Sequence, residues 1–127
     1  MFKYISAASG RYTEISIQCT YYRDDVENPA GNGSYWDESL LTATIQNVLS
    51  RSGYAIRTVN MYEVPDLLED DPEWFDEDAP DGMSIQIICN KYISDEATCE
   101  YILDDLSAEL NKIQYEVVDI SYGSVDI

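Results

Sequence analysis

The stretches ISIQCTY, residues 15–21, and MSIQIIC, residues 83–89, decide the fold. In both of them apolar side chains occupy every second position, mostly with Ser, Gln or Thr between them. This period of two is typical of a strand that buries one face and exposes the other. The first four residues of the two stretches differ only in that Ile15 is replaced by Met83. This likeness indicates that the chain has two related halves.

Each of these strands is followed by a segment with helical periodicity. The first helix is expected to be capped by Ser34 or Asp37 and to end at Gly53, and the second is expected to begin at Ser94. The residues expected on the buried faces are Leu41, Ile45, Val48 and Ser52 in the first helix, and Cys99, Ile102, Leu103, Leu106, Leu110 and Ile113 in the second.

Residues 54–62 and 115–122 are expected to be the strands that follow the two helices, because β-branched and aromatic side chains dominate both. Tyr54-Ala55-Ile56 in the first of them parallels Tyr115-Glu116-Val117 in the second, which again suggests two halves. Within residues 54–62, one side of the strand is expected to carry Ala55, Val59 and Met61.

The chain is therefore expected to form a single α+β domain over residues 1–127. Its order is strand–helix–strand, an acidic insertion at residues 63–82, and strand–helix–strand. Two βαβ units of this kind form a ferredoxin-like, two-layer sandwich with both helices on one face of a mainly antiparallel sheet. Residues 3–8, which precede the turn signal Ser9-Gly10, are a candidate for an extra N-terminal strand.

Charge excludes several classes of function. Seven Lys and Arg side chains stand against 25 Asp and Glu, so the net charge is −18, and the sequence contains no His. Such a surface repels nucleic acid and anionic membranes, and every catalytic or metal site built on His is excluded. No segment has the length and apolarity of a membrane span, so the protein is expected in the cytoplasm, which is the host's if a phage encodes it.

No part of the sequence has the spacing of a catalytic or cofactor site. The cysteines Cys19, Cys89 and Cys99 form no CxxC pair, and the first two continue an apolar alternation, so they are read as buried hydrophobic residues. No glycine-rich phosphate-binding loop occurs, and residues 76–82 fail as an EF-hand loop because Pro80 takes a ligand position. Among 25 acids, paired carboxylates arise by chance. We therefore expect no enzyme, no cofactor and no metal site.

The acidic insertion also contains aromatic residues. From Glu63 to Asp81 it has ten Asp or Glu and no Lys or Arg, and such a long connection is unusual in a small domain. Aromatic anchors ringed by charge are typical of a recognition surface; alternatively, Trp74 and Phe75 fold back onto the sheet as a lid. The predicted partner-binding residues are Glu69, Asp70, Asp71, Glu73, Trp74, Phe75, Asp76, Glu77 and Asp78.

The second predicted helix carries another acidic surface. Glu96, Glu100 and Asp104 recur every four residues, with Asp105 and Glu109 beside them. The three like-charged pairs at that spacing cost roughly 1 kcal/mol together. Four residues of helix rise about 6 Å, and two steps along a DNA strand advance about 6.8 Å, so the row can imitate phosphates. The alternative is a solvated face that serves solubility.

In charge and size the chain resembles the small acidic DNA-mimic proteins of phages and mobile elements, the anti-CRISPR and anti-restriction inhibitors. The resemblance rests on the five helix carboxylates and the acidic insertion, and not on a sequence motif. It implies that the protein sterically blocks the DNA- or RNA-binding surface of a basic host defence protein, a restriction nuclease or a CRISPR effector. Two alternatives remain: an immunity protein or antitoxin that plugs a cognate nuclease toxin, and a non-catalytic interaction module that forms a homodimer.

Overall fold

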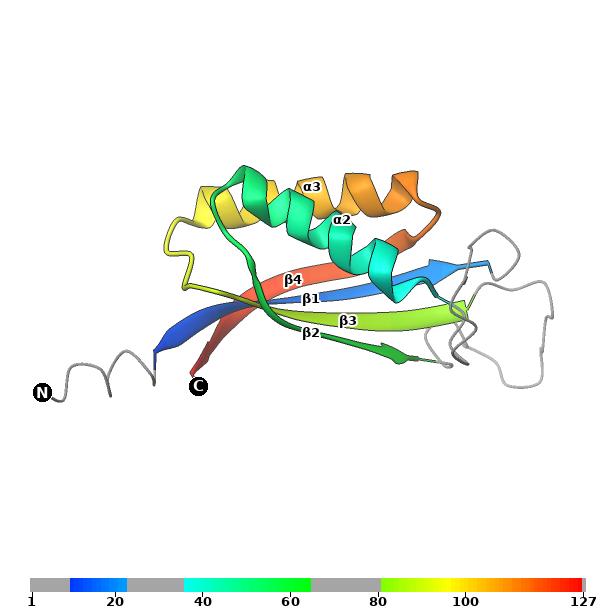
Figure 1. Ribbon diagram of the computed structural model, residues 1–127, viewed down its shortest axis with the longest axis horizontal. Coiled ribbons are helices and arrows are strands. Elements are labelled where there is room, and N and C mark those ends of the chain that lie inside the picture. The colour runs from blue at the N-terminus through cyan, green and yellow to red at the C-terminus, as the bar shows by residue number, and fades with distance from the viewer. Residues whose placement is uncertain (1–9, 23–35, 65–80, 127) are drawn as a thin grey trace, which may run out of the picture.

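Strands and helices alternate in the computed structural model, which describes residues 10–22, 36–64 and 81–126. In chain order the elements are β1 (Arg11–Tyr21), α2 (Glu38–Arg51), β2 (Ile56–Glu63), β3 (Asp81–Cys89), α3 (Glu96–Lys112) and β4 (Glu116–Asp126). The strands form one antiparallel sheet in the order β2-β3-β1-β4, and both helices cover the same face of it (Figure 1). The predicted ferredoxin-like sandwich is confirmed. The predicted extra strand at residues 3–8 lies outside the described residues.

The two stretches that decide the fold lie side by side at the centre of the sheet. Ile15 pairs with Ile87 and Ile17 with Ile85, and all four side chains are fully buried. The apolar faces of the two helices cover these strands and complete the core, as the sequence predicts. Leu49 of α2 is also buried, which the sequence pattern did not predict. The fully or almost fully buried helix residues are Leu41, Ile45, Val48 and Leu49 of α2, and Cys99, Ile102, Leu106 and Leu110 of α3.

The edge strand β2 contains a bulge that corrects its predicted pattern. Between Ile56 and Thr58 the register with β3 shifts, which makes Arg57 an extra residue. A bulge of this kind changes which face the following side chains point to. As a result, Ile56 packs against the core with Val59 and Met61. A strict alternation of side chains predicts Ala55 on the core side of this strand, but Ala55 lies before the first residue of β2.

The other edge strand, β4, is bulged in the same way. Its register with β1 shifts so that Cys19 pairs with Val117 and Gln18 with Asp119, which leaves Val118 as the extra residue. Val117 and Ile120 consequently both pack against the core, while Val118 is exposed. The bulges keep both edge strands in phase with the central pair.

Aspartate side chains cap both helices at their N-termini. Asp37 accepts a hydrogen bond from the Leu40 N–H at 3.1 Å, and Asp95 accepts one from the Ala97 N–H at 3.2 Å. Asp37 was one of the two predicted caps of α2, whereas α3 begins after Asp95 and not at Ser94. Each cap satisfies a backbone donor that the helix itself leaves unpaired.

The two helices also end in the same way, which supports the relation between the two halves. The residue after each C-cap is left-handed: Gly53 has φ 82° and Gln114 has φ 73°. A left-handed residue at this position lets the next N–H reach back to a free carbonyl of the last turn. These hydrogen bonds run from Tyr54 to Leu49 at 2.9 Å and from Tyr115 to Leu110 at 3.0 Å.

The acidic insertion leaves from and returns to a pair of neighbouring strands. Glu63 of β2 pairs with Met83 of β3, and the Val64 N–H donates to the Gly82 carbonyl at 2.9 Å. Glu63 and Asp81 therefore belong to the sheet, together with Gly82. The acidic stretch proper joins two antiparallel strands, and its residues 65–80 lie outside the described residues.

The two helix ends give a matched stability test. Gly53→Ala is expected to lower the free energy of unfolding by about 1 kcal/mol, because a left-handed residue with a Cβ is strained. A Cβ at Gly53 meets no atom within 4 Å, so no steric clash adds to this strain. Gln114→Gly is expected to raise the free energy of unfolding by about 0.5 kcal/mol, since relief of strain exceeds the added freedom of the unfolded chain. Urea denaturation measures both, and a loss of stability in Gln114→Gly would contradict the prediction.

Candidate functional site

Helix α3 divides its polar side chains between two sides. The helices lie side by side on the sheet, with α2 packed on β2 and α3 packed on β4. Side chains of α3 that do not enter the core therefore point towards α2, outwards past the edge of β4, or directly away from the sheet. Because the helix turns about 100° per residue, Glu100 and Asp105 are separated by about 140° around its axis.

Glu96, Glu100 and Asp104 form a row of exposed carboxylates that turns from the β4 side of α3 at Glu96 towards the face opposite the sheet at Asp104. Their spacing of four residues gives about 6 Å between successive positions. Among the described residues, no Lys or Arg lies within ion-pair distance of these three carboxylates. We call these three residues the α3 row. It is the part of the predicted helix site whose negative charge no described Lys or Arg neutralises.

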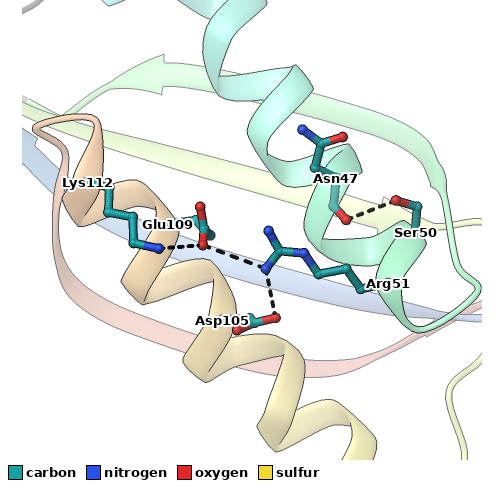
Figure 2. Close-up of polar contacts among 6 residues, drawn as sticks. All are labelled: Asn47, Ser50, Arg51, Asp105, Glu109 and Lys112. Atoms are coloured by element: carbon teal, nitrogen blue, oxygen red, sulfur yellow. Dashed lines mark hydrogen bonds and ion pairs between the residues drawn. The ribbon is translucent and has the colours of Figure 1, made fainter.

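Asp105 and Glu109 instead face α2 (Figure 2). The Arg51 guanidinium of α2 lies 3.2 Å from the Asp105 carboxylate and 3.7 Å from that of Glu109. The Lys112 ammonium adds a hydrogen bond of 2.9 Å to Glu109. Both carboxylates are only 24% exposed, so they tie the two helices together and do not continue the α3 row.

These ion pairs make the repulsion within α3 smaller than the sequence predicts. Like charges four residues apart lower helix stability, but Arg51 and Lys112 compensate the pair formed by Asp105 and Glu109. The hydrogen bond from Lys112 lowers the pKa of Glu109, and the charges of Lys112 and Arg51 add to this effect. Only the pairs within the α3 row remain uncompensated.

Every Lys and Arg among the described residues already has a local contact. Besides Arg51 and Lys112, Arg11 lies 3.6 Å from Asp126 and 5.6 Å from the centre of the Tyr92 ring. The other two cations contact aromatic rings, Arg57 that of Tyr12 at 4.4 Å and Lys91 that of Tyr54 at 5.7 Å. Such contacts are attractive because the ring face is negative. None of these five described cations forms an ion pair with the α3 row.

Tyr122 of β4 belongs to the same surface and was missed by the sequence reasoning. Desolvation raises the pKa of its hydroxyl, and the nearby carboxylates of Glu96 and Glu100 raise it further. The ring is 38% exposed. The only signal in the sequence was its position at the end of the predicted strand 115–122, which gave no indication that α3 would lie beside it.

The predicted residues of the acidic insertion cannot be placed beside this surface. All nine, from Glu69 to Asp78 and including Trp74 and Phe75, lie outside the described residues. The structure fixes only where the insertion is attached, between β2 and β3, whereas the α3 row lies towards β4. The acidic insertion is therefore attached near the β2 edge of the sheet, whereas the α3 row lies near the opposite edge, which is β4.

The cysteines are buried core residues, as predicted for Cys19 and Cys89. Desolvation raises the pKa of Cys19 to about 12 and that of Cys89 to about 11, and it also raises the pKa of Cys99. A thiol with a raised pKa is a poor nucleophile because the thiolate is the reactive form. In the described part of the chain, no group of three His, Cys, Asp or Glu is placed to hold a metal ion.

The chain is similar to the C-terminal domain of the MgtC protein from Mycobacterium tuberculosis, whose solution structure it matches with a TM-score of 0.48 and 11% sequence identity. The match covers 91% of this chain and 89% of that domain. No family model and no curated protein sequence matches the chain. Neither of the two described helices is long and apolar enough to cross a membrane.

The contacts of Glu109 predict how stability depends on pH. The pKa of Glu109 in the folded state is lowered from the ordinary 4.5. The contribution of its carboxylate to the free energy of unfolding is therefore complete above pH 4.5, and it is lost as the pH falls through the lowered pKa. The difference in the free energy of unfolding between the native protein and Glu109→Gln is expected to shrink below pH 4.5. Denaturation curves over a pH series measure it. In an Arg51→Met/Lys112→Met background this pH dependence should disappear, and its persistence would contradict the assigned cause.

Thiol reactivity tests the reading of the cysteines. With its pKa raised from 9.0 to about 12, Cys19 is expected to react with a disulfide reagent at pH 8 about a thousandfold more slowly than in the unfolded chain. Burial slows it further by restricting access. The release of thionitrobenzoate, with and without urea, measures the difference. A fast reaction of any of the three thiols in the folded protein would identify an activated cysteine instead.

Proposed function

We propose that the protein is a non-catalytic inhibitor that imitates nucleic acid and blocks the DNA- or RNA-binding surface of a basic protein in the cytoplasm. The observation that carries this proposal is the α3 row, three exposed carboxylates about 6 Å apart with no cation beside them among the described residues. The target class that fits this chemistry is a nuclease or CRISPR effector whose groove neutralises phosphates with Lys and Arg.

The distribution of charge favours this function over solubility alone. A helix face that mixes both signs is the more stable one, because opposite charges four residues apart stabilise a helix and like charges destabilise it. Here the chain does pair Asp105 and Glu109 with cations on one side of α3, yet it leaves the outward side unpaired. A cationic partner would relieve the repulsion that remains within the α3 row.

The charge also argues against a homodimeric interaction module. Each copy carries −18, so the approach of a second copy is opposed by repulsion over the whole surface. For a basic partner the long-range electrostatic interaction is attractive instead, which makes the encounter of the two proteins faster and better oriented.

Affinity capture from a lysate of the host cell, followed by mass spectrometry, tests the proposal. We expect recovery of a nucleic-acid-binding protein that added duplex DNA or RNA displaces, because both ligands compete for one basic groove. The binding should weaken steeply as salt rises, as nucleic-acid binding does. A captured protein that nucleic acid fails to displace would contradict mimicry, and a captured nuclease encoded beside this chain would identify the immunity function instead.

Charge reversal tests the α3 row itself. Glu100→Lys/Asp104→Lys is expected to weaken binding to the captured partner at least tenfold, or by about 1.4 kcal/mol, while the fold is kept because the like-charged pairs are relieved. The matched control is Glu38→Lys/Glu63→Lys, which changes the charge equally at exposed positions of α2 and β2. Titration calorimetry gives the affinities and circular dichroism checks the fold. If both variants bind equally, the α3 row is not the contact surface.

A further inference from the structure

The outer edge of β4 pairs with no strand among the described residues. β4 spans Glu116–Asp126, and β1 pairs with one of its edges, while no described strand pairs with the other. Beyond the bulge at Val118, residues 120–125 carry no charge. In the middle of this run a Cβ at Gly123 would meet no atom within 4 Å. An edge of this length exposes backbone N–H and C=O groups that another strand can bind.

Carboxylates border this edge on both faces of the sheet. On the helix side lie Glu96 and Glu100 of the α3 row, near Tyr122, the pKa of whose hydroxyl is raised by desolvation and by these two charges. On the face that the helices do not cover lie Glu116 and Asp119, which are both exposed. In the register of the sheet they pair with Thr20 and Gln18 of β1. No described Lys or Arg pairs with these carboxylates. A strand added to β4 would therefore meet negative charge above and below.

The spacing of the α3 row fits the repeat of an extended strand. Because α3 and β4 are connected by a tight turn and pack on one another, the helix runs back along the strand. Successive carboxylates are about 6 Å apart along α3, and side chains on one face of a strand recur every 6.8 Å or so. Lys or Arg at alternate positions of an added strand would thus come close to Glu100 and Glu96 in turn.

A second copy of this chain is a poor occupant of the edge. Pairing of two β4 strands would bring together the bordering carboxylates of two molecules that each carry −18. Charged residues along an edge are a means by which proteins prevent such self-pairing. The charge that repels a second copy attracts a basic segment.

We propose that the outer edge of β4 binds an extended segment of a partner protein as a fifth strand, with alternate Lys or Arg side chains of that segment facing the α3 row. Backbone hydrogen bonds to β4 provide the attachment, and the carboxylates select the sequence. This inference rests on the basic partner of the proposed function and adds how that partner is held.

Synthetic peptides of roughly ten residues test the proposal with the purified protein. One peptide alternates Lys and Thr, and the other contains the same residues as a block of Lys followed by a block of Thr. Fluorescence anisotropy is expected to give an affinity about tenfold higher for the alternating peptide. Hydrogen exchange at residues 119–126 should slow only with that peptide. Equal affinities would overturn the proposal, because simple attraction by charge does not distinguish the two sequences.

Two further comparisons separate the backbone and the charge contributions. When the alternating peptide is N-methylated at every Lys or at every Thr, only one of the two should lose binding, since alternate N–H groups of an added strand face β4. Glu96→Gln/Glu100→Gln should reduce the affinity about tenfold, whereas Asp105→Asn/Glu109→Gln, which removes the same charge on the α2 side, should not. Equal losses in either comparison would overturn the proposal. If these peptide experiments fail, the proposed function is still tested separately by whether nucleic acid displaces a captured partner.

Discussion

The pairing of β1 with β3 determines where every other part of the protein lies. It puts Ile15, Ile17, Ile85 and Ile87 on one face of the central ribbon, and that face must be covered because burial of apolar surface dominates folding. Both helices therefore lie on the same side, and the flanking strands must present their apolar residues to it. The bulges at Arg57 and Val118 are the adjustment by which β2 and β4 meet this requirement.

The scarcity of cations gives each of them a large effect on the pattern of charge. Exposed ion pairs contribute only about 0.2–1 kcal/mol each, so Arg51 and Lys112 add little stability through Asp105 and Glu109. Their larger effect is to neutralise the contact between α2 and α3. The other carboxylates of α3, Glu96, Glu100 and Asp104, lie on the side of the helix away from this contact. One helix thereby carries a neutralised side and an acidic side.

Much of this fold can be predicted from the sequence, because alternation in residues 15–21 and 83–89 and the periodicity of the helices report burial directly. The shift of Ile56 to the core side could not be predicted, since a bulge depends on the partner strand and leaves no local signal. The separation of Asp105 from Asp104 was likewise hidden. Adjacent residues on a helix differ by about 100° in direction, and only the position of Arg51 on α2 decides which of them is paired.

The net charge has two opposed consequences for an exposed sheet edge. Long unpaired edges favour aggregation, and at β4 the bordering acids Glu116, Asp119 and Asp126 stand against it. The repulsion acts between two copies over distances near the Debye length, about 8 Å at physiological ionic strength, and falls away as salt rises. The same screening weakens the attraction of a basic segment. The acidic surface and the edge of β4 are therefore compatible in the proposed site: the charge keeps identical copies apart under the same conditions of low salt in which it would attract the proposed basic segment.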